Sequence, residues 1–306
     1  MMTLPEITNK LPIAEVADFN QHSRDRWVYD KSQTTPKGAK VLDIGAGTCP
    51  YRKFFSHCDY KSQDFKKYEG PKLWGAKDYG QIDYESDIID IPVESSSFDI
   101  ILCTEVLEHV PEPILAMKEM ARIVKPSGRL FVTAPLLMGL HQLPYHFYSG
   151  YTPEWYKLMA KKFGLEVKDI TPNGGYFKFL SQECGRFKYS MNKHAHLHGE
   201  YKAALEYLFG EWLPRYLFDL DGKLLIEEFT VGYFVEFVKK DDGSFTHADD
   251  SSWGKSINYS NVSALLDEAE KFFADGYNEK AKRLALAAYS IDPKSIRSKK
   301  LLEKIK

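Results

Sequence analysis

A glycine-rich turn near the start of the chain has the residue types of a ligand-binding loop. The apolar run Val41-Leu-Asp-Ile passes through Asp43 into Gly45-Ala46-Gly47, ahead of a helical pattern. Glycines let a backbone turn sharply and approach a ligand that a side chain would exclude. A dinucleotide fold needs a small residue where Pro50 stands, and an acid beside the turn would repel a phosphate. The turn therefore predicts a ligand with a positively charged end rather than NAD.

A short acidic string follows a later apolar run. Glu105, Glu108 and His109 are spaced i, i+3 and i+4, which predicts that they share one face of a short helix. Two carboxylates and an imidazole suit Mg²⁺ or another oxygen-preferring ion, and His141 is the candidate further ligand. Similar strings also occur without a metal, with the histidine packing locally. The sequence favours the metal-free interpretation.

Histidines and aromatic residues crowd the segment 134–152. His141 and His146 are candidate general bases because an imidazole titrates near neutral pH, although either could brace the loop through backbone hydrogen bonds. Tyr145 and Tyr151 are expected to line the same pocket, where aromatic faces suit a cationic group. The segment is therefore predicted to form the loop that receives the second substrate.

Alternating strands and helices must position these groups. Short apolar runs predict strands at 40–44, 59–63, 82–86, 98–103, 128–134, 165–170 and 229–238. Helical patterns lie at 13–30, 50–57, 112–124 and 153–163, and a longer helical insert covers about 176–225. This alternation predicts an α/β fold, a doubly wound and mostly parallel sheet that binds ligands beyond the carboxyl ends of its strands.

The overall composition is that of an ordinary globular protein. The 306 residues include 41 Lys+Arg and 43 Asp+Glu, so the charge balance gives no support to nucleic-acid binding. Four cysteines without a C-x-x-C pair suggest neither a disulfide scaffold nor a cysteine zinc site. No signal pattern and no apolar run of about 18–20 residues is evident, so we expect no transmembrane segment and a cytoplasmic protein.

The last part of the chain has a different pattern. Residues 241–261 are polar, with Gly, Ser and Asp clusters, and are predicted to be a linker after a domain of residues 1–240. Residues 262–306 contain two helical patterns that resemble a tetratricopeptide hairpin followed by a capping helix. Such a unit is expected to dock on a protein partner or on a second copy of the chain.

Five ordered segments carry a family resemblance. VLDIGAGTCPYRKFF resembles the first motif of class I S-adenosylmethionine-dependent methyltransferases, of the kind called methyltransferase type 11. The resemblance implies a Rossmann-like seven-stranded sheet whose last strand is antiparallel. It also implies that S-adenosylmethionine contacts the glycine turn, an acid at the end of the second strand, and the adenine-holding segment. The residues carried over onto these positions are Asp43, Gly45, Ala46, Gly47, Asp64, Asp87, Ile88 and Thr104.

The resemblance implies methyl transfer to a hydroxyl or amine of a small-molecule or glycan-type acceptor. One alternative is a metal-assisted RNA 2′-O-methyltransferase, whose E-x-x-E-H segment the string 105–109 resembles. The other is a non-catalytic scaffold that binds partners through residues 262–306. The absence of a basic groove disfavours RNA, and the intact glycines and acids disfavour the scaffold.

Overall fold

The computed structural model describes residues 12–70, 78–195, 198–221, 226, 228–241, 262–274, 278–292 and 294–305. The chain divides into two compact units, Met1–His247 and Ala248–Lys306, each with a hydrophobic core of its own. No helix in the described ranges is both long enough and apolar enough to cross a membrane.

A seven-stranded sheet is the centre of the first unit. Its strand order is β3-β2-β1-β4-β5-β7-β6, and β7 runs antiparallel to both β5 and β6 while the other neighbours are parallel. The predicted Rossmann-like sheet with an antiparallel last strand is thereby confirmed. The strands are β1 (Lys40–Ile44), β2 (Asp59–Asp64), β3 (Tyr84–Glu85), β4 (Phe98–Thr104), β5 (Val124–Pro135), β6 (Leu165–Pro172) and β7 (Gly232–Lys239).

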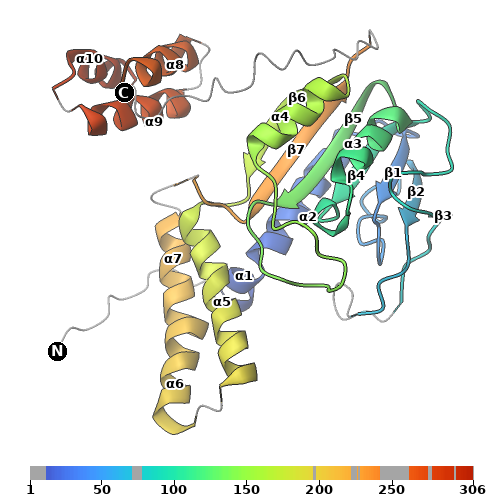
Figure 1. Ribbon diagram of the computed structural model, residues 1–306, viewed down its shortest axis with the longest axis horizontal. Coiled ribbons are helices and arrows are strands. Elements are labelled where there is room, and N and C mark those ends of the chain that lie inside the picture. The colour runs from blue at the N-terminus through green and yellow to red at the C-terminus, as the bar shows by residue number, and fades with distance from the viewer. Residues whose placement is uncertain are drawn as a thin grey trace. The chain divides into compact units, whose positions relative to one another are not determined.

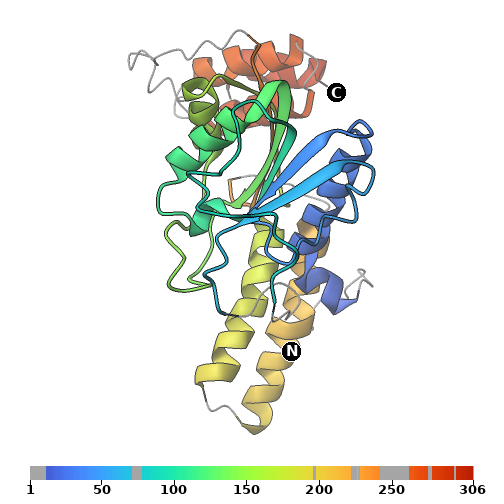
Figure 2. The same cartoon turned by 90° about the vertical axis from the view of Figure 1, so that its right-hand side faces the viewer.

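Helices cover both faces of this sheet (Figures 1 and 2). Successive side chains of a strand point to opposite faces, so Val41 packs with α2 (Phe19–Gln33) on one side. Leu42 lies in the larger core on the other side, with α3 (Pro113–Ile123) and α4 (Pro153–Lys162). Both α3 and α4 begin at a proline, which fits the first turn because its missing N–H would have no intrahelical partner.

Two helix predictions differ from the structure. The segment predicted as one helix at 13–30 is divided at Asp18 into α1 (Ile13–Ala17) and α2. The segment 50–57 forms consecutive turns instead of a helix. Its aromatic side chains Tyr51 and Phe55 nevertheless pack on the sheet, and tertiary packing of this kind overrides helical spacing in short segments.

A helical hairpin is inserted between β6 and β7. It consists of α5 (Tyr176–His194), α6 (Gly199–Tyr207), a π-helical turn at Leu208–Trp212 and α7 (Leu213–Asp221). Figure 1 shows it extending away from the sheet. The backbone N–H groups of Gly175 and Lys178 each donate to Oδ1 of the buried Asp221 over 3.1 Å, so the end of α7 caps the start of α5.

The second unit is made of α8 (Val262–Ala274), α9 (Asn278–Ile291) and α10 (Ile296–Lys304). Its core joins leucines of α8 to alanines of α9, and Leu301 and Ile305 close it from the end of the chain. The predicted linker lies, from residue 242 onward, outside the described residues. Docking of this unit on a partner or on a second copy stays a prediction.

Candidate active site

A cavity of about 520 Å³ opens beyond the carboxyl ends of β1, β2 and β4. The predicted pocket residues His141 and Tyr145 line it, whereas His146 and Tyr151 do not. All eight residues that the family resemblance places at the cofactor also line it: Asp43, Gly45, Ala46, Gly47, Asp64, Asp87, Ile88 and Thr104. The sheet thus brings residues from four separate segments into one space.

The glycine turn after β1 is fixed to the end of β2. Gly45 has φ +65°, and a Cβ there would lie 2.4 Å from Cγ2 of Val106. Its N–H donates to Oε1 of Gln63 over 3.3 Å, and the N–H of Gly47 donates to Oδ2 of Asp64 over 2.9 Å. A side chain at position 45 would therefore disturb both the turn and Val106, which lies two residues after the end of β4.

Asp43 is a buried acid at the end of β1. Its side chain is 2% exposed and accepts a hydrogen bond from the hydroxyl of Tyr60. Burial raises the pKa of the Asp43 carboxyl to about 7, and the nearby carboxyl of Asp64 adds to the effect. A positively charged ligand in the cavity would favour the ionised form of Asp43.

Asp64 ends β2 and faces the cavity. Its carboxylate accepts from the N–H of Gly47 and, over 2.8 Å, from the N–H of Lys66, while burial raises its pKa. The carboxylate of Asp64 keeps acceptor capacity for a further donor, such as a ligand hydroxyl. Asp87 is exposed and Ile88 is buried. This pair can therefore present a polar and an apolar group to the aromatic ring of a bound ligand.

The acidic string after β4 differs from the prediction. The only helical turn there is Leu107–His109, and Glu105 lies before it with φ +53°. Oε1 of Glu105 accepts from the hydroxyl of Thr133 over 2.8 Å, and Oε2 lies 3.5 Å from the guanidinium of Arg24. The shared helix face expected for Glu105, Glu108 and His109 is therefore wrong, because the left-handed turn directs Glu105 toward α2.

Three histidine rings lie close together, and two of them, His109 and His141, line the cavity. The ring centroids of His109 and His141 are 4.9 Å apart, and those of His141 and His146 are 4.4 Å apart. Nδ1 of His109 contacts the carbonyl of Tyr145, and Nδ1 of His141 lies 2.9 Å from the carbonyl of Gly139. Burial lowers the pKa of His109 to about 4, so this imidazole is neutral near pH 7.

Tyr151 belongs to the core rather than to the cavity. Its ring is 4% exposed and packs on Trp155 at a centroid distance of 4.4 Å. Its hydroxyl donates to the carbonyl of Leu107 over 2.7 Å. Tyr151 was expected to line the pocket for the second substrate, but the chain turns inward there before α4 begins.

Several cavity residues carried no sequence signal. Arg24 comes from α2, where a polar residue in an amphipathic helix is unremarkable, yet it is 5% exposed and donates to the hydroxyl of Tyr51. Gln63 holds the glycine turn through Oε1 and the carbonyl of Ser86 through Nε2, over 2.7 Å. Only the three-dimensional arrangement brings these residues to the ligand side.

The sheet order, the glycine turn after β1 and the carboxylates beside it define a class I S-adenosylmethionine-dependent methyltransferase fold. Residues 42–132 match the family model described as a methyltransferase domain. The matched residues run from the first strand into the fifth and include the whole glycine turn. The chain thus contains an S-adenosylmethionine-dependent methyltransferase domain, and S-adenosylmethionine is its cofactor.

Individual relatives show the same similarity. Demethylmenaquinone methyltransferase of Bacillus pumilus is 29% identical over 160 residues, which cover 48% of this chain and 68% of the relative. Ubiquinone biosynthesis O-methyltransferase of Xanthomonas oryzae pv. oryzae is 31% identical over 102 residues, 31% of this chain and 43% of the relative. A solved structure of phosphoethanolamine N-methyltransferase 2 from Haemonchus contortus with S-adenosyl-L-methionine gives a TM-score of 0.44 at 15% identity, over 76% of this chain and 58% of that one.

Proposed function

We propose that the enzyme transfers a methyl group from S-adenosylmethionine to a hydroxyl or amine of a small-molecule or glycan-type acceptor. The observation that carries this proposal is the shared cavity, which the predicted cofactor residues line together with His141 and Tyr145. Methyl transfer needs the acceptor atom and the methyl carbon held together in line, which a single cavity of this kind can do.

The glycine turn and the acids beside it would bind the cofactor. In the proposed arrangement Asp64 accepts from the ribose hydroxyls, and Asp87 with Ile88 holds the adenine. Asp43 faces the positively charged amino group, and the turn Gly45–Gly47 supports the methionine part. The free acceptor capacity of Asp64 and the buried position of Asp43 support these roles.

The charge of the cavity supports a small, non-anionic acceptor. Among the described lining residues, five acidic side chains (Asp43, Asp64, Asp87, Glu105 and Glu108) outnumber the two basic ones, Arg24 and Lys67. Burial raises the pKa of Asp43 to about 7 and that of Glu108 well above its usual range, so fewer than five of the acids are charged. RNA binding depends on basic groups that neutralise phosphates, so this lining disfavours a polynucleotide. Two relatives, a demethylmenaquinone methyltransferase and a ubiquinone biosynthesis O-methyltransferase, also support a small molecule.

His141 is the better placed of the two candidate bases. Its Nδ1 contacts a carbonyl, which only accepts, so Nδ1 carries the proton and the Nε2 lone pair is free. It lines the cavity, which His146 does not. In the proposed reaction the acceptor proton passes to Nε2 of His141, the acceptor atom bonds to the methyl carbon, and the carbon–sulfur bond breaks to leave a neutral thioether.

Calorimetric titration with S-adenosylmethionine and S-adenosylhomocysteine tests the cofactor site. We expect saturable binding by the wild type and about 100-fold weaker binding by Asp64→Ala, from the loss of roughly 3 kcal/mol of hydrogen bonds to a charged group. Asp59→Ala, at the exposed start of the same strand, is the matched control and should bind normally. Equal affinity of Asp64→Ala and wild type would contradict the proposed cofactor site.

A further inference from the structure

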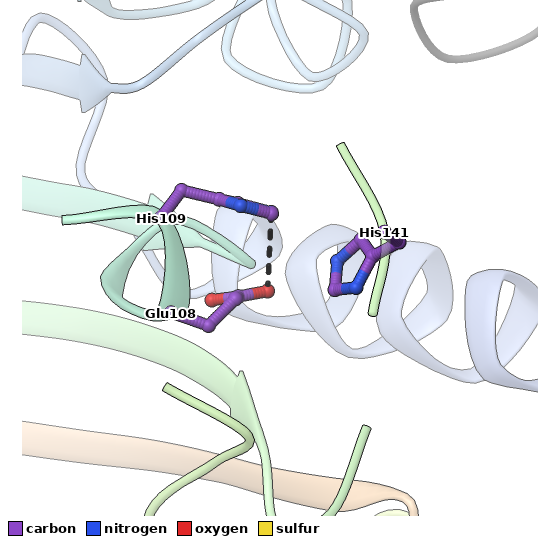
Figure 3. Close-up of side chains that lie close together, drawn as sticks. All are labelled: Glu108, His109 and His141. Atoms are coloured by element: carbon purple, nitrogen blue, oxygen red, sulfur yellow. Dashed lines mark ion pairs between the residues drawn. The ribbon is translucent and has the colours of Figure 1, made fainter. Parts of the chain in front are cut away.

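Three side chains outside the cofactor residues converge on one point. Glu108, His109 and His141 each direct a potential ligand atom there, and these atoms all lie within 4.8 Å of one another. Figure 3 shows His141 on its loop opposite the other two, which come from the turn after β4. Nε2 of His109 is 3.7 Å from Oε1 of Glu108. All three residues line the cavity.

Both histidines offer a lone pair to this point. A carbonyl accepts hydrogen bonds but donates none, so Nδ1 of His109 carries its proton toward Tyr145 and Nδ1 of His141 carries its proton toward Gly139. Each neutral ring therefore keeps the lone pair on Nε2. A backbone carbonyl on the far nitrogen is the usual way in which a metal-binding histidine is oriented.

Glu108 completes the set with an unsatisfied oxygen. Its side chain is 1% exposed, and Oε2 has no hydrogen-bond partner in the described part of the chain. A buried carboxyl oxygen without a partner is costly. Here it stands beside two imidazole lone pairs, so three potential ligand atoms face one another. A bound cation would satisfy all three.

We propose that Glu108, His109 and His141 bind a divalent transition-metal ion such as Zn²⁺, Mn²⁺ or Fe²⁺. Two imidazoles and one carboxylate suit these ions better than Mg²⁺, which prefers oxygen ligands. Glu105 is not a ligand, because Thr133 and Arg24 hold its carboxylate. The site thus differs both in its residues and in its metal from the one that the spacing of the acidic string suggested.

The spacing of the three atoms is compatible with one ion. Imidazole and carboxylate ligands lie about 2.1 Å from zinc, so two ligands of a tetrahedral ion are about 3.4 Å apart. The 3.7 Å between His109 and Glu108 is close to this value. His141 lies on the loop 136–150, and its ligand atom is within 4.8 Å of the other two. Three protein ligands leave at least one position open toward the cavity.

The ion would also assist the methyl transfer proposed above, and this role of the ion rests on that proposal. A divalent ion polarises an acceptor hydroxyl and so promotes loss of its proton. In the metal-bound form the Nε2 lone pair of His141 would bind the ion, so the acceptor proton would pass to water. The transfer to Nε2 of His141 proposed above would be the step of the metal-free form. Metal binding as such does not depend on the identity of the acceptor.

Titration of the chelator-treated protein with Co²⁺ tests the site without an activity assay. We expect saturation at one ion per chain with visible absorption bands typical of nitrogen and oxygen ligands, and displacement of Co²⁺ by Zn²⁺. His141→Ala and Glu108→Gln should each weaken binding at least 100-fold. His22→Ala, on the exposed surface of α2, should bind like the wild type.

The result that overturns the proposal is the absence of saturable binding, or equal Co²⁺ affinity in wild type and His141→Ala. His141→Ala changes a partly exposed loop residue, so it should fold even if Glu108→Gln does not. Binding of S-adenosylhomocysteine to the metal-free protein is measured in parallel. Its retention would show that the cofactor site stands whatever the outcome for the metal.

Discussion

The hydroxyl of Tyr60 donates to the carboxylate of Asp43 between the adjacent strands β2 and β1. This hydrogen bond favours the ionised acid, but the burial of Asp43 outweighs it and raises its pKa to about 7. The acid beside the glycine turn therefore changes its charge in the physiological pH range. The next two predictions follow from this pair.

Cofactor affinity should rise with pH through neutrality. If the amino group of the cofactor binds to ionised Asp43, a pKa near 7 implies roughly tenfold weaker binding at about pH 6 than at about pH 8. Calorimetry with S-adenosylhomocysteine across this range measures the effect. 5′-Methylthioadenosine, which lacks the amino group, is the control and should show a flatter profile. A steep profile for both ligands would assign the titration to another group.

Asp43→Asn should stabilise the ligand-free protein at neutral pH. The folded pKa of Asp43 lies above the ordinary value of 3.8, so the unfolded chain loses its proton at lower pH and folding loses stability as pH rises from about 4 to 7. An uncharged isostere removes this cost, and we expect a gain of roughly 2–4 kcal/mol in the free energy of unfolding at pH 8. Urea unfolding at about pH 3, below both the folded and the ordinary pKa of Asp43, should show little difference. Asp59→Asn, on an exposed position, is the control.

The two glycines of the turn should respond differently to alanine. A Cβ at Gly45 meets Val106 at 2.4 Å, whereas a Cβ at Gly47 meets nothing within 4 Å, and both have positive φ. Gly47→Ala should cost about 1–2 kcal/mol from backbone strain alone, and Gly45→Ala clearly more. Thermal unfolding compares them. Val106→Ala combined with Gly45→Ala should recover part of the loss; no recovery would mean that the contact with Val106 is not the cause.

The sequence predicted the cofactor side of the cavity better than the acceptor side. Gly45, Gly47 and Asp64 lie in short segments next to strands, where local spacing fixes which group reaches the edge of the sheet. The alternation of strands and helices predicted a mostly parallel sheet, and the family resemblance implied the antiparallel last strand. The strand order, which brings these segments together, comes from the structure.

The acceptor side depends on contacts between distant elements. Arg24 reaches the cavity only because α2 packs on the sheet, and Glu105 turns away because Arg24 and Thr133 hold it. Helical spacing could not predict this, since the segment after β4 is helical for only one turn. A local pattern thus indicates the residue types of this site but not which of them face the ligand.

Substitutions at Tyr145 and at Tyr151 should have different effects: one on ligand affinity, the other on the free energy of unfolding. The buried hydroxyl of Tyr151 satisfies the carbonyl of Leu107, so Tyr151→Phe should lower the free energy of unfolding by about 1–2 kcal/mol and leave cofactor affinity unchanged. Tyr145 lines the cavity and its ring packs against Phe65 at a centroid distance of 5.1 Å. Tyr145→Ala should weaken ligand binding more than it lowers stability. Urea unfolding and calorimetry on both variants measure the two effects, and a loss of cofactor affinity in Tyr151→Phe would place that residue in the site after all.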